Sequence, residues 1–241
     1  MIDLELRDRV AVITLRRPEK RNALDTQACL DLAAALDHAV AGGARCLVLA
    51  GEGSNFCSGA DLRTVEDEAF VPTLYRTLGR LQDVPICTVA AVHGPALGAG
   101  TQLAIACDLR VVAPDTRFGI PAAKLGLMTD HWTAQRLALL AGAGPARAVL
   151  LACEELDAEV SLRLGLANRA GDLDAALAWA EEIGRLAPLT IAGHKLALNR
   201  LEPKLDDPDV TAAFARAWAS DDLAEGQAAR REKRAPNFQG R

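Results

Sequence analysis

The sequence predicts an α/β protein whose sheet is mainly parallel, followed by a helical C-terminal region. Short apolar runs typical of buried strands alternate with helix-like apolar stripes up to about residue 113, and this alternation favours parallel pairing. From there on the patterns are helical. The sequence therefore predicts a core that carries the ligand site over 1–187 and a helical region that builds an oligomer over 188–241.

The individual elements follow from local signals. Asp25 is a residue type that caps helices, and Gly42 follows the end of the same stripe, so a helix is expected between them. The proline-containing polar run 16–22 is expected to be a loop. Strands are expected at 2–6, 10–15, 46–50, 86–92 and 109–113. Helices are expected from about 100 to 106, at about 133–141, 145–153, 158–164 and 172–186, and beyond 188.

Composition excludes several classes of protein. The chain of 241 residues is 50% hydrophobic, enough for a sizeable core, and its net charge of -5 argues against a nucleic-acid binder. No apolar run reaches the roughly 20 residues that span a bilayer. The first residues show no signal-peptide pattern. Six scattered cysteines without metal-ligand spacing predict buried reduced thiols in a cytoplasmic protein that holds no metal.

Two glycine-rich loops, 56–62 and 93–100, are the candidate site. Glycine lets the backbone approach a ligand, and a loop that enters a helix leaves free N–H donors at its start. Two converging donors would form an oxyanion hole for a polarised carbonyl. The alternative is a pair of tight turns. Neither loop fits the G-x-G-x-x-G pattern of dinucleotide sites.

A series of motifs then follows along the chain. They are Arg17-Pro18-x-x-Arg21-Asn22-Ala23-Leu24, Phe56-Cys57-Ser58-Gly59-Ala60-Asp61-Leu62, Gly98-Ala99-Gly100-x-x-Leu103-Ala104-x-x-Cys107-Asp108, Phe118-Gly119-x-Pro121 and Gln135-Arg136-Leu137. Together they resemble the crotonase superfamily, the enoyl-CoA hydratases and isomerases. The resemblance covers nearly the whole chain, from Val10 to Phe238.

This resemblance implies a spiral of ββα units whose C-terminal helices build a homotrimer, often paired into a hexamer. The ligand it implies is an acyl-CoA thioester, with no other cofactor. The oxyanion hole falls on the backbone N–H groups of Ala60 and Ala99. The residues that the resemblance places around the bent CoA are Arg21, Ala23, Ser58, Gly59, Asp61, Leu62, Gly98, Lys233 and Phe238. The resemblance implies that the basic residue of the Lys233 segment approaches the CoA of a neighbouring subunit, and a solvated basic tail is the alternative.

Hydratases of this superfamily use two glutamates, and by position these fall on Gln102 and Ala122. An amide does not exchange protons near neutral pH, and a methyl group offers no proton-transfer chemistry. Since each positioned acid or base contributes about 10²–10⁴-fold, hydration should be largely lost while binding survives.

Asp130 is the candidate for a substitute acid or base, because a few branches of the superfamily place a functional aspartate at this point. The alternative role is a helix N-cap. His131 could act as a base or as a buried hydrogen-bonding residue, and Trp132 is expected in the acyl pocket wall or the core.

The sequence thus predicts an acyl-CoA-binding protein of lipid metabolism that lacks hydratase activity and passes its ligand to lipid-synthesis enzymes. One alternative is an active isomerase or related lyase that uses Asp130 as its single acid/base. Another is a purely structural subunit.

Overall fold

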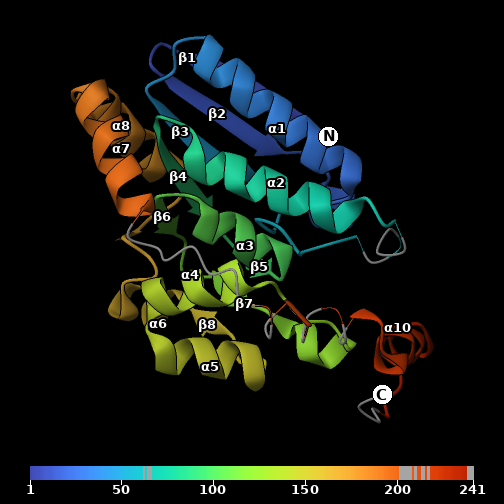
Figure 1. Cartoon of the computed structure of the whole chain (residues 1–241). Coiled ribbons are helices and arrows are strands. Elements are labelled where there is room, and N and C mark those ends of the chain that lie inside the picture. The colour runs from blue at the N-terminus through green and yellow to red at the C-terminus, as the bar shows by residue number, and fades with distance from the viewer. Residues whose placement is uncertain are drawn as a thin grey trace.

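The computed structural model describes residues 1–61, 63, 67–200, 208, 211, 212, 215 and 218–237. It confirms the predicted α/β class, with a central sheet that has helices on both faces (Figure 1). Antiparallel pairing joins only the first two strands of this six-stranded sheet, and the other pairs are parallel, as predicted. Its strands, in spatial order, are β1 (Ile2–Arg7), β2 (Val10–Leu15), β3 (Cys46–Gly51), β4 (Cys87–Val92), β6 (Leu109–Val112) and β9 (Arg169–Ala170).

Side-chain alternation along the strands builds two separate core layers. Ala11 and Ile13 of β2 pack in the larger cluster with α1 (Thr26–Ala41), α2 (Phe70–Asp83) and α3 (Ala99–Ala106). Val10 and Val12 pack on the other face with α7 (Leu173–Gly184), beside α8 (Pro188–Asn199). Because both faces are covered, the inner strands are apolar throughout. Five of the six cysteines are buried, as predicted.

Helix caps set the boundaries that the sequence predicted. The Asp25 side chain accepts a hydrogen bond from the Ala28 N–H at 2.8 Å, and Gly42 is the C-cap of α1. The helices expected after residue 130 are α4 (His131–Ala141), α5 (Ala143–Leu151), α6 (Ala158–Leu164) and α7, each shifted by at most two residues at either end. The boundary proposed between 187 and 188 stays a prediction.

Helix α2 is missing from the sequence prediction, which left residues 62–85 without an element. Its buried apolar residues Phe70, Leu74, Leu78 and Leu81 recur at helical spacing, so the pattern was present, but no described side chain caps the helix start to mark it. The buried Thr77 hydroxyl has hydrogen-bond partners, because the Thr73 and Cys29 carbonyl oxygens both lie within hydrogen-bond distance of it. The prediction also lacked the second sheet and two 3₁₀ turns, which are too short to show a period: β5 (Pro95–Leu97), β7 (Arg117–Gly119), β8 (Leu156–Asp157), η1 (Pro18–Lys20) and η2 (Pro121–Leu125).

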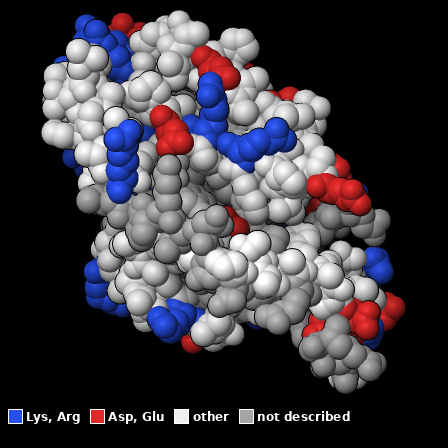
Figure 2. Space-filling model, viewed as in Figure 1, with Lys and Arg blue, Asp and Glu red and all other residues white. Residues whose placement is uncertain are grey.

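The C-terminal helix α10 (Asp221–Glu232) packs on η2 at the far end of the molecule from α8 (Figure 1). The contact is close at two glycines, since a Cβ at Gly126 would collide with the Asp222 carbonyl and one at Gly226 with the Leu125 carbonyl. In the described ranges, no helix is long and apolar enough to cross a membrane. Figure 2 shows basic and acidic side chains interspersed on one face, and an ion pair joins Arg80 to Asp37 between α2 and α1.

Candidate active site

A cavity of about 840 Å³ lies where the two glycine-rich loops meet α2, η2 and α10. Its walls combine segments that are far apart in the sequence. The lining includes the predicted site residues Arg21, Ala23, Ser58, Gly59, Ala60, Asp61, Gly98, Ala99, Gln102 and Ala122. The structure therefore brings most of the predicted site together in one place.

The backbone around Ala60 and Ala99 leaves their N–H groups available. Leu24 and Ala60 form a parallel β-bridge. Its two hydrogen bonds involve the residues on either side of Ala60: the Leu24 N–H donates to the Gly59 carbonyl, and the Asp61 N–H donates to the Leu24 carbonyl. In parallel pairing this directs the Ala60 N–H away from Leu24. Ala99 is the first residue of α3, where an N–H has no partner inside the helix. Two donors in one cavity suit a polarised carbonyl, and their role as an oxyanion hole stays a prediction.

Glycine is required where the two loops touch. A Cβ on Gly59, which has φ +106°, would lie 2.8 Å from the Leu97 carbonyl oxygen and 3.7 Å from the Ala99 nitrogen. Gly98 has φ +54°, a conformation that side chains disfavour. The glycines therefore allow the backbone of residues 59–60 to lie against that of residues 97–99.

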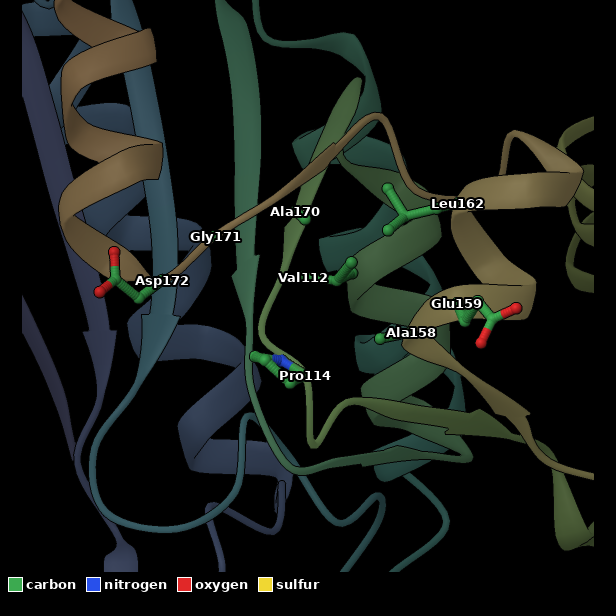
Figure 3. Close-up of a pocket in the computed structure, with 8 residues that line it drawn as sticks. All are labelled: Val112, Pro114, Ala158, Glu159, Leu162, Ala170, Gly171 and Asp172. Carbon is green, nitrogen blue, oxygen red and sulfur yellow. The ribbon is translucent and has the colours of Figure 1, made fainter.

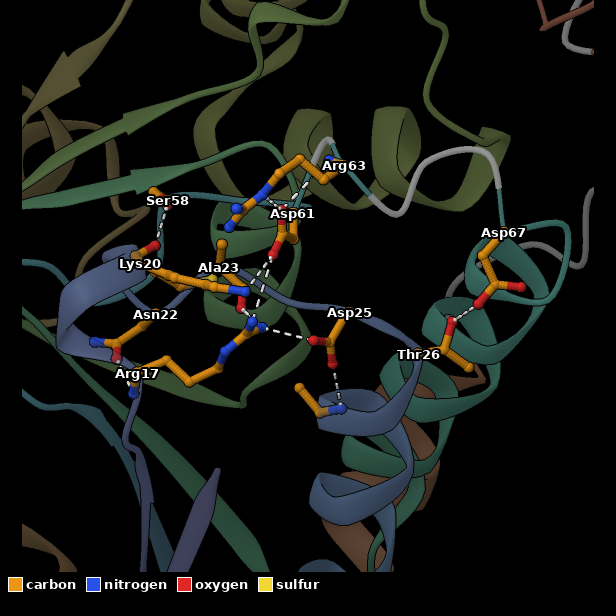
Figure 4. A network of polar contacts seen from close by, with 12 residues as sticks. Arg17, Lys20, Asn22, Ala23, Asp25, Thr26, Ser58, Asp61, Arg63 and Asp67 are labelled. Atoms are coloured by element: carbon orange, nitrogen blue, oxygen red, sulfur yellow. Dashed lines mark hydrogen bonds and ion pairs between the residues drawn. The ribbon is translucent and has the colours of Figure 1, made fainter.

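A buried ion network supports the rim of the cavity (Figure 4). The Arg17 guanidinium donates to the Ala23 carbonyl at 2.7 Å and forms ion pairs with Asp25 at 2.9 Å and Asp61 at 3.4 Å. The Asn22 amide donates to the Asn55 carbonyl at 2.7 Å, and its oxygen accepts from the Arg17 N–H at 2.9 Å. This network holds the turn that carries Arg21 and Ala23, although Arg21 and Asn22 both have positive φ.

The lining is predominantly basic on the rim side. The Asp61 carboxylate forms ion pairs with Lys20 at 3.1 Å and with Arg63 at 3.3 Å. Burial raises the pKa of the Asp61 carboxyl, but hydrogen bonds from Lys20 and Arg63 outweigh burial and lower the pKa overall. Among the described lining residues, the charged ones are the basic Lys20, Arg21, Arg63, Arg230 and Arg231 and the acidic Glu19 and Asp61. This excess of positive charge suits an anionic ligand.

Gln102 and Ala122 line the same cavity from α3 and η2. Gln102 is only 4% exposed, and its amide nitrogen donates to the Thr133 hydroxyl at 2.7 Å. Of the described lining residues, only Glu19 and Asp61 carry carboxyl groups, and both belong to the rim loops. The described part of the chain holds no group of three His, Cys, Asp or Glu side chains placed for a metal ion.

Asp130, His131 and Trp132 lie behind this lining. Asp130 is the N-cap of α4, where it accepts from the Thr133 N–H at 3.2 Å, so its alternative structural role is confirmed. Burial raises the pKa of its carboxyl. The Trp132 indole donates to Gln82 of α2 at 2.8 Å. His131 Nδ1 is buried and meets no hydrogen-bond partner among the described residues. Their part in substrate binding stays a prediction.

The C-terminal helix adds two basic lining residues that were not predicted, and the contact of Lys233 with the CoA of a neighbouring subunit stays a prediction. Lys233 is an exposed C-cap residue of α10, whereas Arg230 and Arg231, one turn earlier, line the cavity. Sequence reasoning also missed Tyr75 and Trp218 in the lining. Tyr75 could have been found only together with α2. Leu62 and Phe238 lie outside the described residues.

A second hollow, of about 660 Å³, lies between α6, β6 and β9 (Figure 3). Its walls are apolar, including Val112 and Leu162, and its two acidic residues are Glu159 and Asp172. Asp172 is engaged as the N-cap of α7. None of the predicted site residues that the structure describes lines it, so the larger cavity is the candidate active site.

Comparisons with known proteins identify the family of the chain. The family model described as "Enoyl-CoA hydratase/isomerase" matches residues 5–241. A relative from Mycobacterium tuberculosis (strain CDC 1551 / Oshkosh), "Probable enoyl-CoA hydratase echA6", is 47% identical over 248 residues and 100% of both chains.

Two solved structures share the fold closely. An enoyl-CoA hydratase/isomerase from Pseudoalteromonas atlantica T6c has a TM-score of 0.88 and 30% identity, covering 99% of each chain. A methylmalonyl-CoA decarboxylase in complex with 2-nitronate-propionyl-CoA has a TM-score of 0.91 and 25% identity, covering 100% of this chain and 98% of that one. On the match to its family model and on its relatives, the chain belongs to the enoyl-CoA hydratase/isomerase family of the crotonase superfamily.

Proposed function

We propose that this protein binds fatty acyl-CoA thioesters and lacks enoyl-CoA hydratase activity. The observation that carries the proposal is a cavity that retains its glycine loops and basic rim but has Gln102 and Ala122 at the two glutamate positions. Neither side chain transfers a proton near neutral pH. The protein therefore keeps the means to hold a thioester without the means to add water to it.

The lining suits both ends of such a ligand. The five basic residues of the rim favour the phosphate groups of coenzyme A. Apolar side chains further inside favour an acyl chain, and they include Phe70, Leu74, Ile120, Leu127 and Met128. The backbone N–H groups of Ala60 and Ala99 would receive the thioester oxygen between these two regions.

A hydration assay with crotonyl-CoA and longer enoyl-CoA substrates tests the proposal. We expect turnover more than about a hundredfold below that of an ordinary hydratase, because two acid–base groups are missing. Calorimetry should still detect binding of saturated acyl-CoA. The double variant Gln102→Glu/Ala122→Glu is the matched comparison and should gain turnover. Turnover of the unmodified protein within a hundredfold of that of the hydratase would contradict the proposal. The protein would then be an active enoyl-CoA hydratase, as the names of its relatives suggest.

A second candidate function is double-bond isomerisation with Asp130 as single acid/base. The observation that favours it is the half-buried Asp130 carboxyl, whose pKa is raised by burial and which is linked to Gln102 by hydrogen bonds through the Thr133 hydroxyl. Moving a double bond requires only one proton shuttle. The variant Asp130→Asn should abolish an isomerase rate if this function holds, and should retain affinity for saturated acyl-CoA if the protein only binds.

We further propose a cytoplasmic homotrimer or hexamer that delivers acyl-CoA to lipid-synthesis enzymes. Exposed leucines on α8 support an assembly surface, since Leu189 is 88% exposed. A purely structural subunit remains the third candidate. It predicts no thermal shift with acyl-CoA, whereas a ligand at 100 times its Kd should add about 2.7 kcal/mol of stability.

A further inference from the structure

Gln102 in the cavity lining and two side chains behind it form a chain of hydrogen bonds. The Gln102 amide nitrogen donates to the Thr133 hydroxyl oxygen at 2.7 Å, and the Thr133 hydroxyl donates to Asp130 Oδ1. Thr133 is fully buried, and Gln102 is 4% exposed. Gln102 reaches the cavity lining, whereas Thr133 and Asp130 lie behind it at the start of α4.

The Asp130 carboxyl determines which atom donates and which accepts in each of these hydrogen bonds. The Thr133 backbone N–H donates to Oδ1 at 3.2 Å, so this oxygen is an acceptor whether or not the carboxyl carries a proton on Oδ2. The Thr133 hydroxyl has a single hydrogen and uses it on the same oxygen. It can therefore only accept from Gln102, which requires the NH₂ end of the amide to face Thr133.

The second amide hydrogen is also directed into the protein. Burial and the charge of Asp130 raise the pKa of the Tyr75 phenol, and hydrogen bonds from the Asp130 backbone and the Gln102 amide offset part of that rise. The phenol is thus neutral at physiological pH, and the amide NH₂ serves Thr133 and Tyr75. The carbonyl oxygen Oε1 is the end of Gln102 that can meet a ligand, because the NH₂ end is turned toward Thr133.

Helix geometry places this oxygen near a defined part of the ligand. Gln102 lies three residues after Ala99 on α3, so the two residues are neighbours on one helix face, about 5–6 Å apart at Cβ. A thioester oxygen held at the Ala99 N–H would therefore bring the next carbons of the acyl chain beside Gln102. Ala122 and Ile120, also in the lining, offer no side-chain hydrogen-bonding group there.

Building on the proposed acyl-CoA function, we infer that Asp130 and Thr133 are positioning residues that turn the Gln102 carbonyl oxygen toward the ligand. The cavity then favours thioesters that carry a hydroxyl group on the β-carbon over their saturated counterparts. A β-hydroxyl donates to Oε1, and a saturated chain leaves this acceptor without a partner. In this arrangement Asp130 sets ligand preference and takes no part in proton transfer.

The test compares two matched ligands on the full chain by calorimetry: β-hydroxyoctanoyl-CoA, as separate stereoisomers, and octanoyl-CoA. We expect one stereoisomer to bind about fivefold more tightly than octanoyl-CoA, the effect of one net hydrogen bond. Gln102→Leu should reduce this ratio to about one. Thr133→Val should also reduce it, although Gln102 is still present, and Thr133→Ser should preserve it.

The ratio separates positioning from folding, because a general loss of packing weakens both ligands together. Retention of the preference in Gln102→Leu, or equal affinities in the unmodified protein, would overturn the inference. If Thr133→Val does not fold, the Gln102→Leu result decides alone. Failure of both thioesters to bind the unmodified protein would instead refute the acyl-CoA function itself, so the two proposals fail in distinguishable ways.

Discussion

Arg17 is the buried cation on which the rim of the cavity rests, and Asp61 is one of its two carboxylate partners. We expect Asp61→Asn to lower the free energy of unfolding at pH 7 by about 3 kcal/mol, because it breaks a buried ion pair. Urea unfolding measures the change. Asp37→Asn, which removes an exposed pair with Arg80, is the control and should cost about 0–1 kcal/mol. Equal effects of the two variants would contradict the argument.

The destabilisation caused by Asp61→Asn should depend on pH. The pKa of Asp61 is lower in the folded protein than its ordinary value of 3.8. A carboxyl shifted in this direction stabilises the fold above its unfolded pKa, and the stabilisation disappears as pH falls through the folded pKa. The difference in unfolding free energy between the unmodified protein and Asp61→Asn should therefore be constant near neutrality and narrow below about pH 4.

Single positions were predictable where a motif fixes them. Gln102 and Ala122 are found by counting from the glycine loop and from Pro121, and the structure places both in one cavity. The orientation of the Gln102 amide was not predictable, because it depends on Thr133, 31 residues further along the chain. The same holds for Trp132, whose partner Gln82 lies 50 residues earlier in the chain, on a helix that the prediction missed.

At the scale of elements, the packing of α3 against the loop at 56–61 is the critical contact. A Cβ at Gly100 would collide with the Cys57 carbonyl oxygen, which accepts from the Leu97 N–H. We expect Gly100→Ala to destabilise the fold by about 1–3 kcal/mol through overpacking and to weaken acyl-CoA binding. Thermal unfolding and calorimetry measure the two effects.

Gly79 provides the matched control for this prediction. It lies inside α2, and an added Cβ there meets nothing within 4 Å. Alanine has the higher helix propensity, so Gly79→Ala should stabilise the fold by about 0.5–1 kcal/mol. If Gly100→Ala behaved in the same way, close contact between α3 and the loop would not be needed.

Elements were predictable wherever period and caps agreed. The strands of the main sheet and helix α1 show clear apolar patterns, and Asp25 and Gly42 mark the ends of that helix. Helix α2 shows the apolar period at Phe70, Leu74, Leu78 and Leu81 but has no side-chain cap at its start among the described residues, and the prediction missed it. The strands β8 and β9 contain two residues each, and such short segments form only because tertiary packing aligns them with a neighbour.

At the scale of the whole molecule, the cavity joins an N-terminal turn, α2, α3, η2 and α10. Helix α10 brings Arg230 and Arg231 to the rim although they lie about two hundred residues from Arg21 in the chain. No local pattern encodes this meeting, since it depends on the close glycine contacts at Gly126 and Gly226. The sequence motifs predicted the candidate site, and tertiary structure adds Arg230 and Arg231 to the basic rim of the cavity.

The proposed assembly predicts that the exposed leucines of α8 lie in a contact between subunits. Leu189 and Leu196 lie seven residues apart on one face of α8 and are 88% and 54% exposed. If this face joins subunits, the double variant Leu189→Glu/Leu196→Glu buries charge at the contact and should shift the mass measured by light scattering from trimer or hexamer to monomer. Leu30→Glu on α1, where Leu30 is 47% exposed, is the control and should leave the mass unchanged. A monomeric unmodified protein, or a double variant that keeps its mass, would show that α8 does not hold the assembly together.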